Sequence, residues 1–492
     1  MDIRDLHGAA DVASLDLPVE QMRVMTDEVM CRVLVHLASL GAQHARGDVT
    51  REGAIALCRS MREAAPEDGS ALEPLLDAYF GQWLPHTLTT NGPGYMAYVP
   101  GGGVFPAALA DLVSDTTNRF TGAWFASPPL VQLEANVLDW LRTWMGFPPE
   151  ARGVFTTGGS TATFNGIVCA REKHLGADIR AGVVYTSTQA HHSVRKSARL
   201  AGIAGDRIRA LPVDAEFRLG VDALEAAIAE DRAAGLTPFL VVSAAGTTNT
   251  GAVDPLDAIG DVCAREGLWH HVDGAYGAFF HACEELRPLL AGLSRADSLT
   301  LDPHKGLFLP YGTGALLVRD GARLREVYAA TADYLPGGTP QDMYDPSEHG
   351  PDLSRGFPGL RVWLTVKIYG AARLRAAIAE KRALAVDAAA RIAAVPGVVM
   401  VAPPQLSLFA FHATWPGASR EEENAATKQV LERVGARGRV LLSGCNIAGR
   451  ELARVCVLSF RTRQGNIDAC VEDVTAAITE VVAEATTSNR SR

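Results

Sequence analysis

The sequence lacks the features of a membrane protein, of a nucleic-acid binder and of a disulfide scaffold. No apolar run reaches about 18 residues, so we expect no membrane-spanning helix. A net charge of −10 leaves no basic surface for nucleic acid or an anionic membrane. The eight cysteines form no CxxC pair and no metal-binding cluster, and the acidic start is typical of neither a secretory signal nor a transit peptide. We therefore expect reduced thiols, no bound metal and a cytoplasmic location.

Two familiar phosphate-binding motifs are also missing, and there are no internal repeats. The glycine-rich stretch 156–163 follows an apolar run and precedes a helical one, but it contains neither Gly-Lys-Ser/Thr nor GxGxxG. Its backbone N–H groups and hydroxyls could still hold an anion at the start of a helix. A plain helix cap is the simpler interpretation of such a turn taken alone.

What remains is an ordinary globular composition whose pattern changes along the chain. Hydrophobic residues make up 48% and charged residues 21% of 492 residues, enough for two or three domains. Residues 1–90 have a helical period, residues 91–103 hold five glycines and two prolines, and a helical run follows to Phe147. An N-terminal helical layer without chemistry of its own typically packs on a partner subunit or a larger domain.

From Val154 onward, short apolar runs alternate with helical segments. This alternation predicts βαβ units and an α/β fold with a mostly parallel, doubly wound sheet. The predicted strands are Gly182–Ser187, Pro238–Ala244, Gly267–Val272, Ser298–Leu301 and Gly312–Val318, and two of the helices between them are Asp222–Ala234 and Leu256–Glu266.

The last third of the chain predicts a second, smaller α+β unit. Residues 329–359 are irregular, and a long helical run covers Leu360–Val395. A closing helix and a disordered tail from residue 486 complete the chain, with strands expected near Ser407–His412, Arg439–Ser443 and Val455–Phe460. The pattern divides the chain into residues 1–103, 104–360 and 361–492.

An acid and a lysine stand at the ends of two predicted strands. Asp273 follows the run that begins at Gly267, and Lys305 follows Ser298–Leu301. Because the carboxyl ends of parallel strands face the ligand crevice, both side chains should reach one site. Pyridoxal phosphate needs such a pair, since a lysine forms its imine and a carboxylate keeps its ring nitrogen protonated. Taken singly, a salt bridge for Asp273 and a solvated position for Lys305 are the ordinary alternatives.

Two further strand ends carry polar groups. His191, in QAHHSV, can stack on a flat ring or act as an acid or base, although a strand-end histidine is more often structural. Thr248, in GTTNTG, could reach a ring oxygen, although a turn is the simpler interpretation. The order carries the argument, because a hydroxyl turn, a histidine, a threonine pair, an aspartate and a lysine each follow a predicted strand.

These residues resemble the pyridoxal phosphate-dependent group II amino-acid decarboxylases, a family that includes aromatic-L-amino-acid, histidine and glutamate decarboxylases. The resemblance covers roughly residues 70–480, and its main stretches are TTGGSTAT, YTSTQAHHSV, AGTTNTGAVDPLDAIG, WHHVDGAYGAFF and DPHKGLFLPYGTGALLVRD. It implies a fold-type I enzyme with an N-terminal dimerisation segment (1–103), a cofactor-binding large domain (104–360) and a C-terminal small domain (361–492). It also implies a homodimer with the active site at the subunit interface.

The resemblance assigns roles to individual residues. Lys305 would form the internal aldimine, Asp273 would bind the pyridine nitrogen, and His191 would stack on the ring. Tyr334, in a mobile loop, would protonate the substrate carbon. The other cofactor contacts would come from Gly159, Ser160, Thr248, Ala275 and His304, and the substrate contacts from Tyr98, Val99, Pro100, Gly101, Phe120 and Trp124, some of them in the partner chain.

The implied reaction is decarboxylation of an L-amino acid to its amine through a Lys305 aldimine and a quinonoid intermediate. An aminotransferase would use the same lysine and acid, with Arg461 or Arg355 holding the substrate carboxylate. An oxygen-consuming decarboxylase–deaminase is a second alternative, but in this family it tends to accompany loss of the loop tyrosine or the stacking histidine. Both are present here. Departures from the family at Val99 and Gly101 leave the substrate open, and Asp302 stands where asparagine is common.

Overall fold

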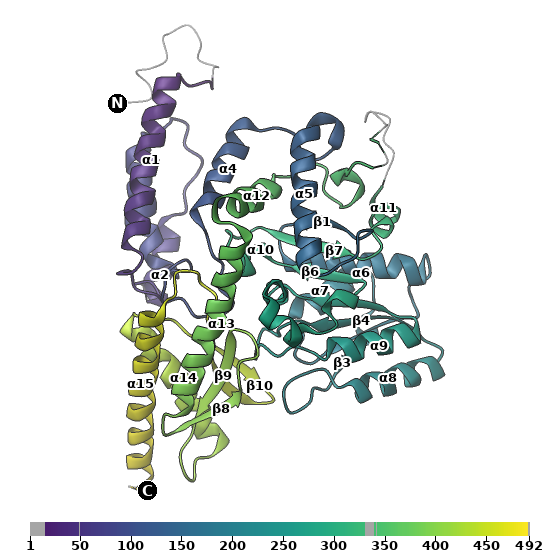
Figure 1. Cartoon of the computed structure of the whole chain (residues 1–492). Coiled ribbons are helices and arrows are strands. Elements are labelled where there is room, and N and C mark those ends of the chain that lie inside the picture. The colour runs from purple at the N-terminus through teal and green to yellow at the C-terminus, as the bar shows by residue number, and fades with distance from the viewer. Residues whose placement is uncertain (1–14, 49, 330–338, 341, 491–492) are drawn as a thin grey trace.

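The computed structural model describes residues 15–48, 50–329, 339–340 and 342–490. The large sheet and its helices form one side of the molecule, and helix α1 and the C-terminal unit lie along the other side (Figure 1). None of the helices in the described ranges combines the length and the apolar character that crossing a membrane requires.

A seven-stranded mixed sheet forms the centre of the large unit. Its strand order is β1-β7-β6-β5-β4-β2-β3; β7 runs antiparallel to β1 and β6, and the other neighbouring pairs are parallel. The fold class predicted from the sequence is thus confirmed, and the short strand β3 is an addition to it. The strands are β1 (Arg152–Thr156), β2 (Gly182–Ser187), β3 (Ile208–Leu211), β4 (Thr237–Ala244), β5 (Trp269–Asp273), β6 (Ser298–Leu301) and β7 (Gly314–Val318).

Both faces of this sheet are buried under helices. Along β7, Ala315 and Leu317 join one apolar cluster while Leu316 and Val318 join another on the opposite face. Strands covered on both faces are continuous apolar runs, which is why the sequence located them so closely. The covering helices of the large unit are α4 (Phe105–Thr117), α5 (Pro128–Trp144), α6 (Gly159–Leu175), α7 (His192–Leu200), α8 (Val221–Ala233), α9 (Leu256–Glu266), α10 (Pro303–Gly306) and α11 (Ala322–Tyr328).

The N-terminal segment is helical but buries little of its apolar surface within this chain. It consists mainly of α1 (Val19–Ser39), α2 (Arg51–Ser60) and α3 (Leu72–Asp77). Met22 and Leu34, two apolar residues of α1, are 44% and 51% exposed. An apolar helix face without cover in one chain is typical of a surface that packs on a second chain.

The C-terminal unit packs helices against a four-stranded antiparallel sheet of order β10-β11-β9-β8. The helical run predicted over Leu360–Val395 is two helices, because Gly370 adopts φ 77° between them. The elements are α12 (Pro358–Tyr369), α13 (Ala371–Ala393), β8 (Val398–Ala402), β9 (Leu408–Ala413), α14 (Arg420–Arg437), β10 (Ser443–Ile447), β11 (Arg450–Cys456) and α15 (Gln464–Arg490).

Three predictions for this unit were wrong or displaced. The strand expected at Arg439–Ser443 begins only at Ser443, since Leu441 instead exchanges backbone hydrogen bonds with residues 94 and 96 of the N-terminal half. The strand expected at Val455–Phe460 is β11, which ends at Cys456. The tail from residue 486 is not disordered throughout, because α15 runs on to Arg490.

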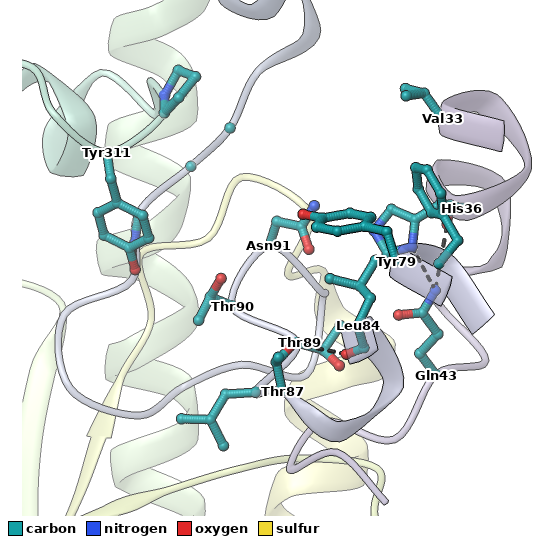
Figure 2. Close-up of a pocket in the computed structure, with 16 residues that line it drawn as sticks. Val33, His36, Gln43, Tyr79, Leu84, Thr87, Thr89, Thr90, Asn91 and Tyr311 are labelled. Atoms are coloured by element: carbon teal, nitrogen blue, oxygen red, sulfur yellow. Dashed lines mark hydrogen bonds between the residues drawn. The ribbon is translucent and has the colours of Figure 1, made fainter. Parts of the chain in front are cut away.

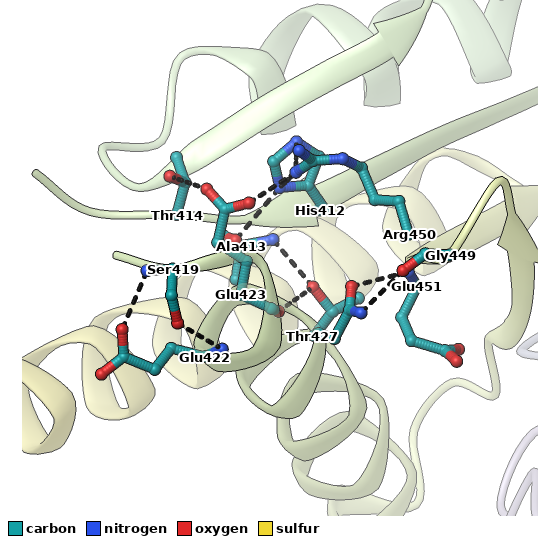
Figure 3. A network of polar contacts seen from close by, with 11 residues as sticks. His412, Ala413, Thr414, Ser419, Glu422, Glu423, Thr427, Gly449, Arg450 and Glu451 are labelled. Carbon is teal, nitrogen blue, oxygen red and sulfur yellow. Dashed lines mark hydrogen bonds and ion pairs between the residues drawn. The ribbon is translucent and has the colours of Figure 1, made fainter. Parts of the chain in front are cut away.

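A polar network fixes α14 to this sheet (Figure 3). Glu423 of α14 accepts a hydrogen bond from Thr414 at 2.5 Å and pairs with Arg450 of β11 at 2.5 Å. Arg450 also donates to Nε2 of His412 on β9, at 3.0 Å. His412 therefore carries its proton on Nδ1, which lies 3.1 Å from the carbonyl of Ala413. Burial lowers the pKa of His412, so the ring is neutral and the arginine charge is balanced by Glu423.

Candidate active site

A cavity of about 440 Å³ opens at the carboxyl ends of β4, β5 and β6 and at the first turns of α6 and α7. Open α/β sheets bind ligands at this edge. The cavity brings together residues from six separate stretches of the chain. It is lined by Tyr98, Val99, Thr157, Gly158, Gly159, Ser160, Thr161, His191, Ser193, Ala244, Gly246, Thr247, Thr248, Asp273, Ala275, Tyr276, Asp302, His304 and Lys305.

Lys305 projects into the cavity from the short helix α10, in the connection between β6 and β7. Its Nζ lies 2.8 Å from Oδ2 of Asp302, and the lysine side chain is 23% exposed. The ordinary alternative of a fully solvated lysine is therefore excluded. An amine held at the cavity wall, with access from one side, is suited to form an imine with a bound aldehyde.

Asp273 ends β5 and opens onto the same cavity. Its carboxylate accepts a hydrogen bond from the backbone N–H of Ala275 at 3.2 Å. Burial raises the pKa of Asp273, and the nearby Lys305 ammonium partly opposes that rise. The arginine salt bridge expected as the ordinary alternative does not occur in the described residues. The carboxylate is thus available to a cationic N–H group of a ligand.

His191 caps the first turn of α7 at the cavity wall. Its Nδ1 accepts the backbone N–H of Ser193 at 3.3 Å and lies 2.7 Å from the hydroxyl of that serine. The neutral ring therefore carries its proton on Nε2. Burial lowers the pKa of His191 to about 4, with further contributions from His192 and Lys305, so the imidazole is uncharged at neutral pH.

The turn before α6 provides an anion cradle. Gly159 lies so close to β5 and β6 that a Cβ atom there would stand 2.9 Å from Cβ of Ala275 and 3.0 Å from Oδ2 of Asp302. Only glycine lets the helix start approach the strands this closely. Backbone N–H groups at the start of a 17-residue helix favour a phosphate. His304 closes this end of the cavity, donating from Nδ1 to the carbonyl of Thr313 at 2.8 Å.

Arg454 is a residue of this region that sequence reasoning missed. It is 3% exposed in β11, and its guanidinium donates to the carbonyls of Thr248, Asn249 (3.1 Å) and Tyr98 (3.4 Å) and to Oγ of Ser443 (2.8 Å). It ties the C-terminal unit to the Thr248 turn and to Tyr98, whose φ is 53°. The sequence feature that could have identified Arg454 is its position as the one charged residue in an otherwise apolar run, LARVCV.

The predicted substrate residues divide into two groups. Tyr98 and Val99 line the cavity, whereas Pro100, Phe120 and Trp124 lie outside it. Gly101 faces a second cavity of about 440 Å³ between the N-terminal segment and the large unit, where Tyr79, Asn91 and Tyr311 are among the lining residues (Figure 2). Tyr334 lies outside the described residues. The substrate assignments stay predictions.

Arg355 and Arg461, the candidates for holding a substrate carboxylate in an aminotransferase, lie outside this cavity. Arg355 pairs with Glu134 of α5, and both side chains are buried. Arg461 donates to the carbonyls of Asn91 and Gly102 at 3.1 and 3.5 Å. Neither guanidinium faces Lys305.

Comparison with known sequences decides the family. The sequence model for the pyridoxal-dependent decarboxylase conserved domain matches residues 56–414, well over half of the chain. The chain belongs to the pyridoxal-dependent decarboxylases. This decarboxylase is 33% identical to aromatic-L-amino-acid decarboxylase from Bacillus atrophaeus, over 91% of this chain and 94% of that relative. It is therefore an amino-acid decarboxylase with pyridoxal phosphate as its cofactor.

Two plant proteins extend the comparison. A crystal structure of Oryza sativa TDC with PLP and tryptamine matches the decarboxylase with a TM-score of 0.90 and 26% identity, covering 95% of this chain and 99% of that one. The 4-hydroxyphenylacetaldehyde synthase of Rhodiola rosea is 29% identical over 84% of this chain and 86% of its own length. The family resemblance is thus confirmed, and it includes relatives named for aldehyde formation.

Proposed function

We propose that this decarboxylase removes the α-carboxyl group of an L-amino acid and releases the amine, with Lys305 as the imine-forming residue. The observation that carries the proposal is the convergence of Lys305, Asp273 and His191 on one cavity from three separate strand ends. Membership of the family supports the reaction type, and the geometry of the cavity supports the choice of residues.

Each side chain has a defined task in this proposal. The bound cofactor supplies an electron sink for the carbon that loses CO2. Asp273 pairs with the ring nitrogen and keeps it protonated, and the start of α6 holds the phosphate. His191 presents a neutral ring with Nε2–H to the cofactor face, so it can pack on that face without adding charge. Lys305 projects from the cavity wall and releases the amine product.

Absorbance of the purified enzyme tests the lysine assignment. Lys305→Ala is expected to abolish the visible absorbance of the cofactor imine, because no other lysine lines the cavity in the described residues. Lys196→Ala, on the exposed face of α7, is the matched control and should keep the full absorbance. Unchanged absorbance of Lys305→Ala would contradict the assignment.

A second candidate function is oxidative decarboxylation to an aldehyde. The likeness to 4-hydroxyphenylacetaldehyde synthase favours including it. Incubation with a panel of L-amino acids, followed by mass spectrometry and a peroxide assay, separates the two reactions and identifies the substrate. The proposal expects an amine without peroxide, whereas an aldehyde with peroxide would establish the second function. A keto acid with pyridoxamine phosphate would contradict both.

We further propose a homodimer in which each chain completes the partner's cavity. The uncovered apolar face of α1 and the position of Phe120 outside its own cavity support it. Mixing inactive Lys305→Ala with an inactive Trp124→Ala variant, after dissociation and reassociation, should restore roughly a quarter of wild-type activity, because half the dimers then hold one intact site. Failure of two inactive variants to complement each other would contradict the shared site.

A further inference from the structure

Helix α7 carries a row of positive charge on its outer face, next to the cofactor cavity. Arg195, Lys196 and Arg199 are exposed there, and we call them the α7 cation stripe. The stripe lines a surface cavity of about 470 Å³. None of the three cations pairs with a carboxylate in the part of the chain that the structure describes. Arg195 donates to the backbone carbonyl of Gly205 at 3.4 Å, which leaves its charge unbalanced.

The inner face of the same helix contacts the start of α6, where the phosphate is expected. Ser193 lines the cofactor cavity, and the hydroxyl of Ser197 donates to the backbone carbonyl of Ser160 at 3.2 Å. Since an α-helix with its side chains is about 10 to 12 Å across, the stripe lies about that far from the start of α6. The screening length at 0.1 M ionic strength is also about 10 Å. The stripe can therefore attract an anion that approaches the start of α6.

The cofactor cavity itself offers little attraction to an anion. Its lining includes two acidic side chains, Asp273 and Asp302, against one lysine, Lys305, and no arginine of the described residues lines it. The whole chain also carries a net charge of −10. A phosphate ester, which carries nearly two negative charges at neutral pH, would therefore be repelled on approach unless cations lie near its path. The α7 cation stripe supplies these cations.

We propose that the α7 cation stripe attracts the phosphate dianion of free pyridoxal phosphate and guides the cofactor to the start of α6. The three cations lie outside the lining of the cofactor cavity, so they act on the approach of the cofactor and do not touch it once it is bound. Charges arranged in this way raise association rates by about 10- to 1,000-fold, and salt removes the effect. The inference rests on the phosphate position under the proposed function, whereas the cofactor itself follows from the family.

The rate at which cofactor-free enzyme binds pyridoxal phosphate tests the inference. Arg195→Glu/Arg199→Glu reverses the charge of the stripe, and the growth of imine absorbance after rapid mixing gives the association rate constant. At about 10 mM ionic strength, where the screening length is about 30 Å, the variant should bind pyridoxal phosphate at least about tenfold more slowly than wild type. At about 1 M, where this length is about 3 Å, the two rates should agree within about twofold. The dissociation rate and the final absorbance should stay unchanged.

Three controls separate the effect of charge from an effect on the fold. Pyridoxal, which lacks the phosphate, should bind to wild type and to the reversed variant at equal rates at either ionic strength. Arg195→Lys/Arg199→Lys keeps both charges and should retain the wild-type rate. Arg420→Glu/Lys428→Glu makes the same change in net charge at exposed positions of α14 that line neither cavity, and it should slow binding by less than about twofold.

Several results would overturn the inference. Binding of pyridoxal phosphate to the reversed variant at the wild-type rate would show that the stripe guides no phosphate and is left for another anionic partner. Equal slowing with pyridoxal would assign the effect to the fold, and equal slowing in the α14 variant would assign it to net charge. A change confined to the dissociation rate would make the arginines part of the bound site. A wild type that binds pyridoxal phosphate no more tightly than pyridoxal would overturn the phosphate position itself, and this inference with it.

Discussion

At the residue scale, the two adjacent histidines at the start of α7 occupy different environments. His191 lines the cavity and His192 is exposed, although their ring centroids are only 4.1 Å apart. The sequence predicted that one histidine of this pair would serve the site. The hydrogen bond from the Ser193 backbone to Nδ1, which sets the proton on Nε2, could not be predicted, because it depends on the turn geometry.

The pair provides a matched test of function. His191→Asn should lower kcat by roughly 100-fold, because the ring that packs on the cofactor and can donate from Nε2 is lost. His192→Asn should leave kcat near the wild-type value. Steady-state kinetics with saturating pyridoxal phosphate measure both. Equal losses in the two variants would contradict the assignment of His191 as the site residue.

Arg355 shows why pairing across the sequence escapes prediction. Its partner Glu134 lies more than two hundred positions earlier, in α5, and is fully buried. The sequence offered Arg355 only as a candidate for holding a substrate carboxylate in an aminotransferase. In the structure the Arg355 charge is instead balanced by Glu134 in a buried ion pair. Glu134 also accepts a hydrogen bond from the backbone N–H of Gly359, at the start of α12, at 3.3 Å.

Removal of Glu134 should be costly. Glu134→Gln leaves the Arg355 charge buried without a counter-ion and should lower the free energy of unfolding by about 3 kcal/mol. Asp139→Asn, which breaks the exposed pair with Arg142 on the same helix, should cost less than about 1 kcal/mol. Urea denaturation followed by circular dichroism compares the two. Similar small losses would show that the buried pair is not a stabilising contact.

At the scale of elements, the sequence predicted the large sheet well and the small sheet poorly. β2, β6 and α9 have the predicted limits, because strands buried on both faces and a helix ending at a glycine leave clear patterns. β10 has the sequence SGCNI with alternating exposure and few apolar side chains, so its pattern gave no strand signal. The apolar residues 440–442 did give a strand signal, but the central one, Leu441, pairs instead with the N-terminal half.

Gly370 separates α12 from α13 and sets the angle between these two helices. Its φ of 77° and ψ of 146° are accessible almost only to glycine. Gly370→Ala should therefore lower the free energy of unfolding by about 2 kcal/mol, even though no atom crowds the position. Gly465→Ala, in α15 and equally uncrowded, should be neutral or slightly stabilising. Thermal unfolding distinguishes them, and a neutral Gly370→Ala would show that the junction can relax.

At the scale of the whole molecule, buried ionisable groups make stability depend on pH. Burial lowers the pKa of His270 to about 4 and of His271 to about 3, so the unfolded chain binds more protons than the folded chain between those values and about 6.5. Stability from these groups is complete above about pH 6.5 and is lost as the pH falls. Asp254 opposes this trend, because burial raises its pKa to about 6, and burial also raises the pKa of Asp273 and of Glu134. The histidines are nevertheless the larger set, because burial lowers the pKa of His191 and of His349 to about 4 as well.

The free energy of unfolding should therefore fall between pH 6 and pH 4, by on the order of 1 kcal/mol per pH unit for each histidine. Urea midpoints measured across this range provide the slope. His271→Gln removes one of the titrating groups and should flatten the curve. Stability that rises on acidification would contradict the assignment of buried neutral histidines.

The position of β1 at the edge of the large sheet governs the order in which the enzyme can assemble during synthesis. Residues 152–156 find their sheet partner only in residues 314–318, and α6 with its phosphate turn follows β1 directly. The pairing of β1 with β7 forms slowly, because the chain between the two strands must first be synthesised and folded. A nascent chain that stops before Val318 has no strand against which to anchor the phosphate turn. We therefore expect the cofactor to bind late in synthesis, after residues 314–318 have been made. Incomplete chains that end before Val318 should remain without cofactor.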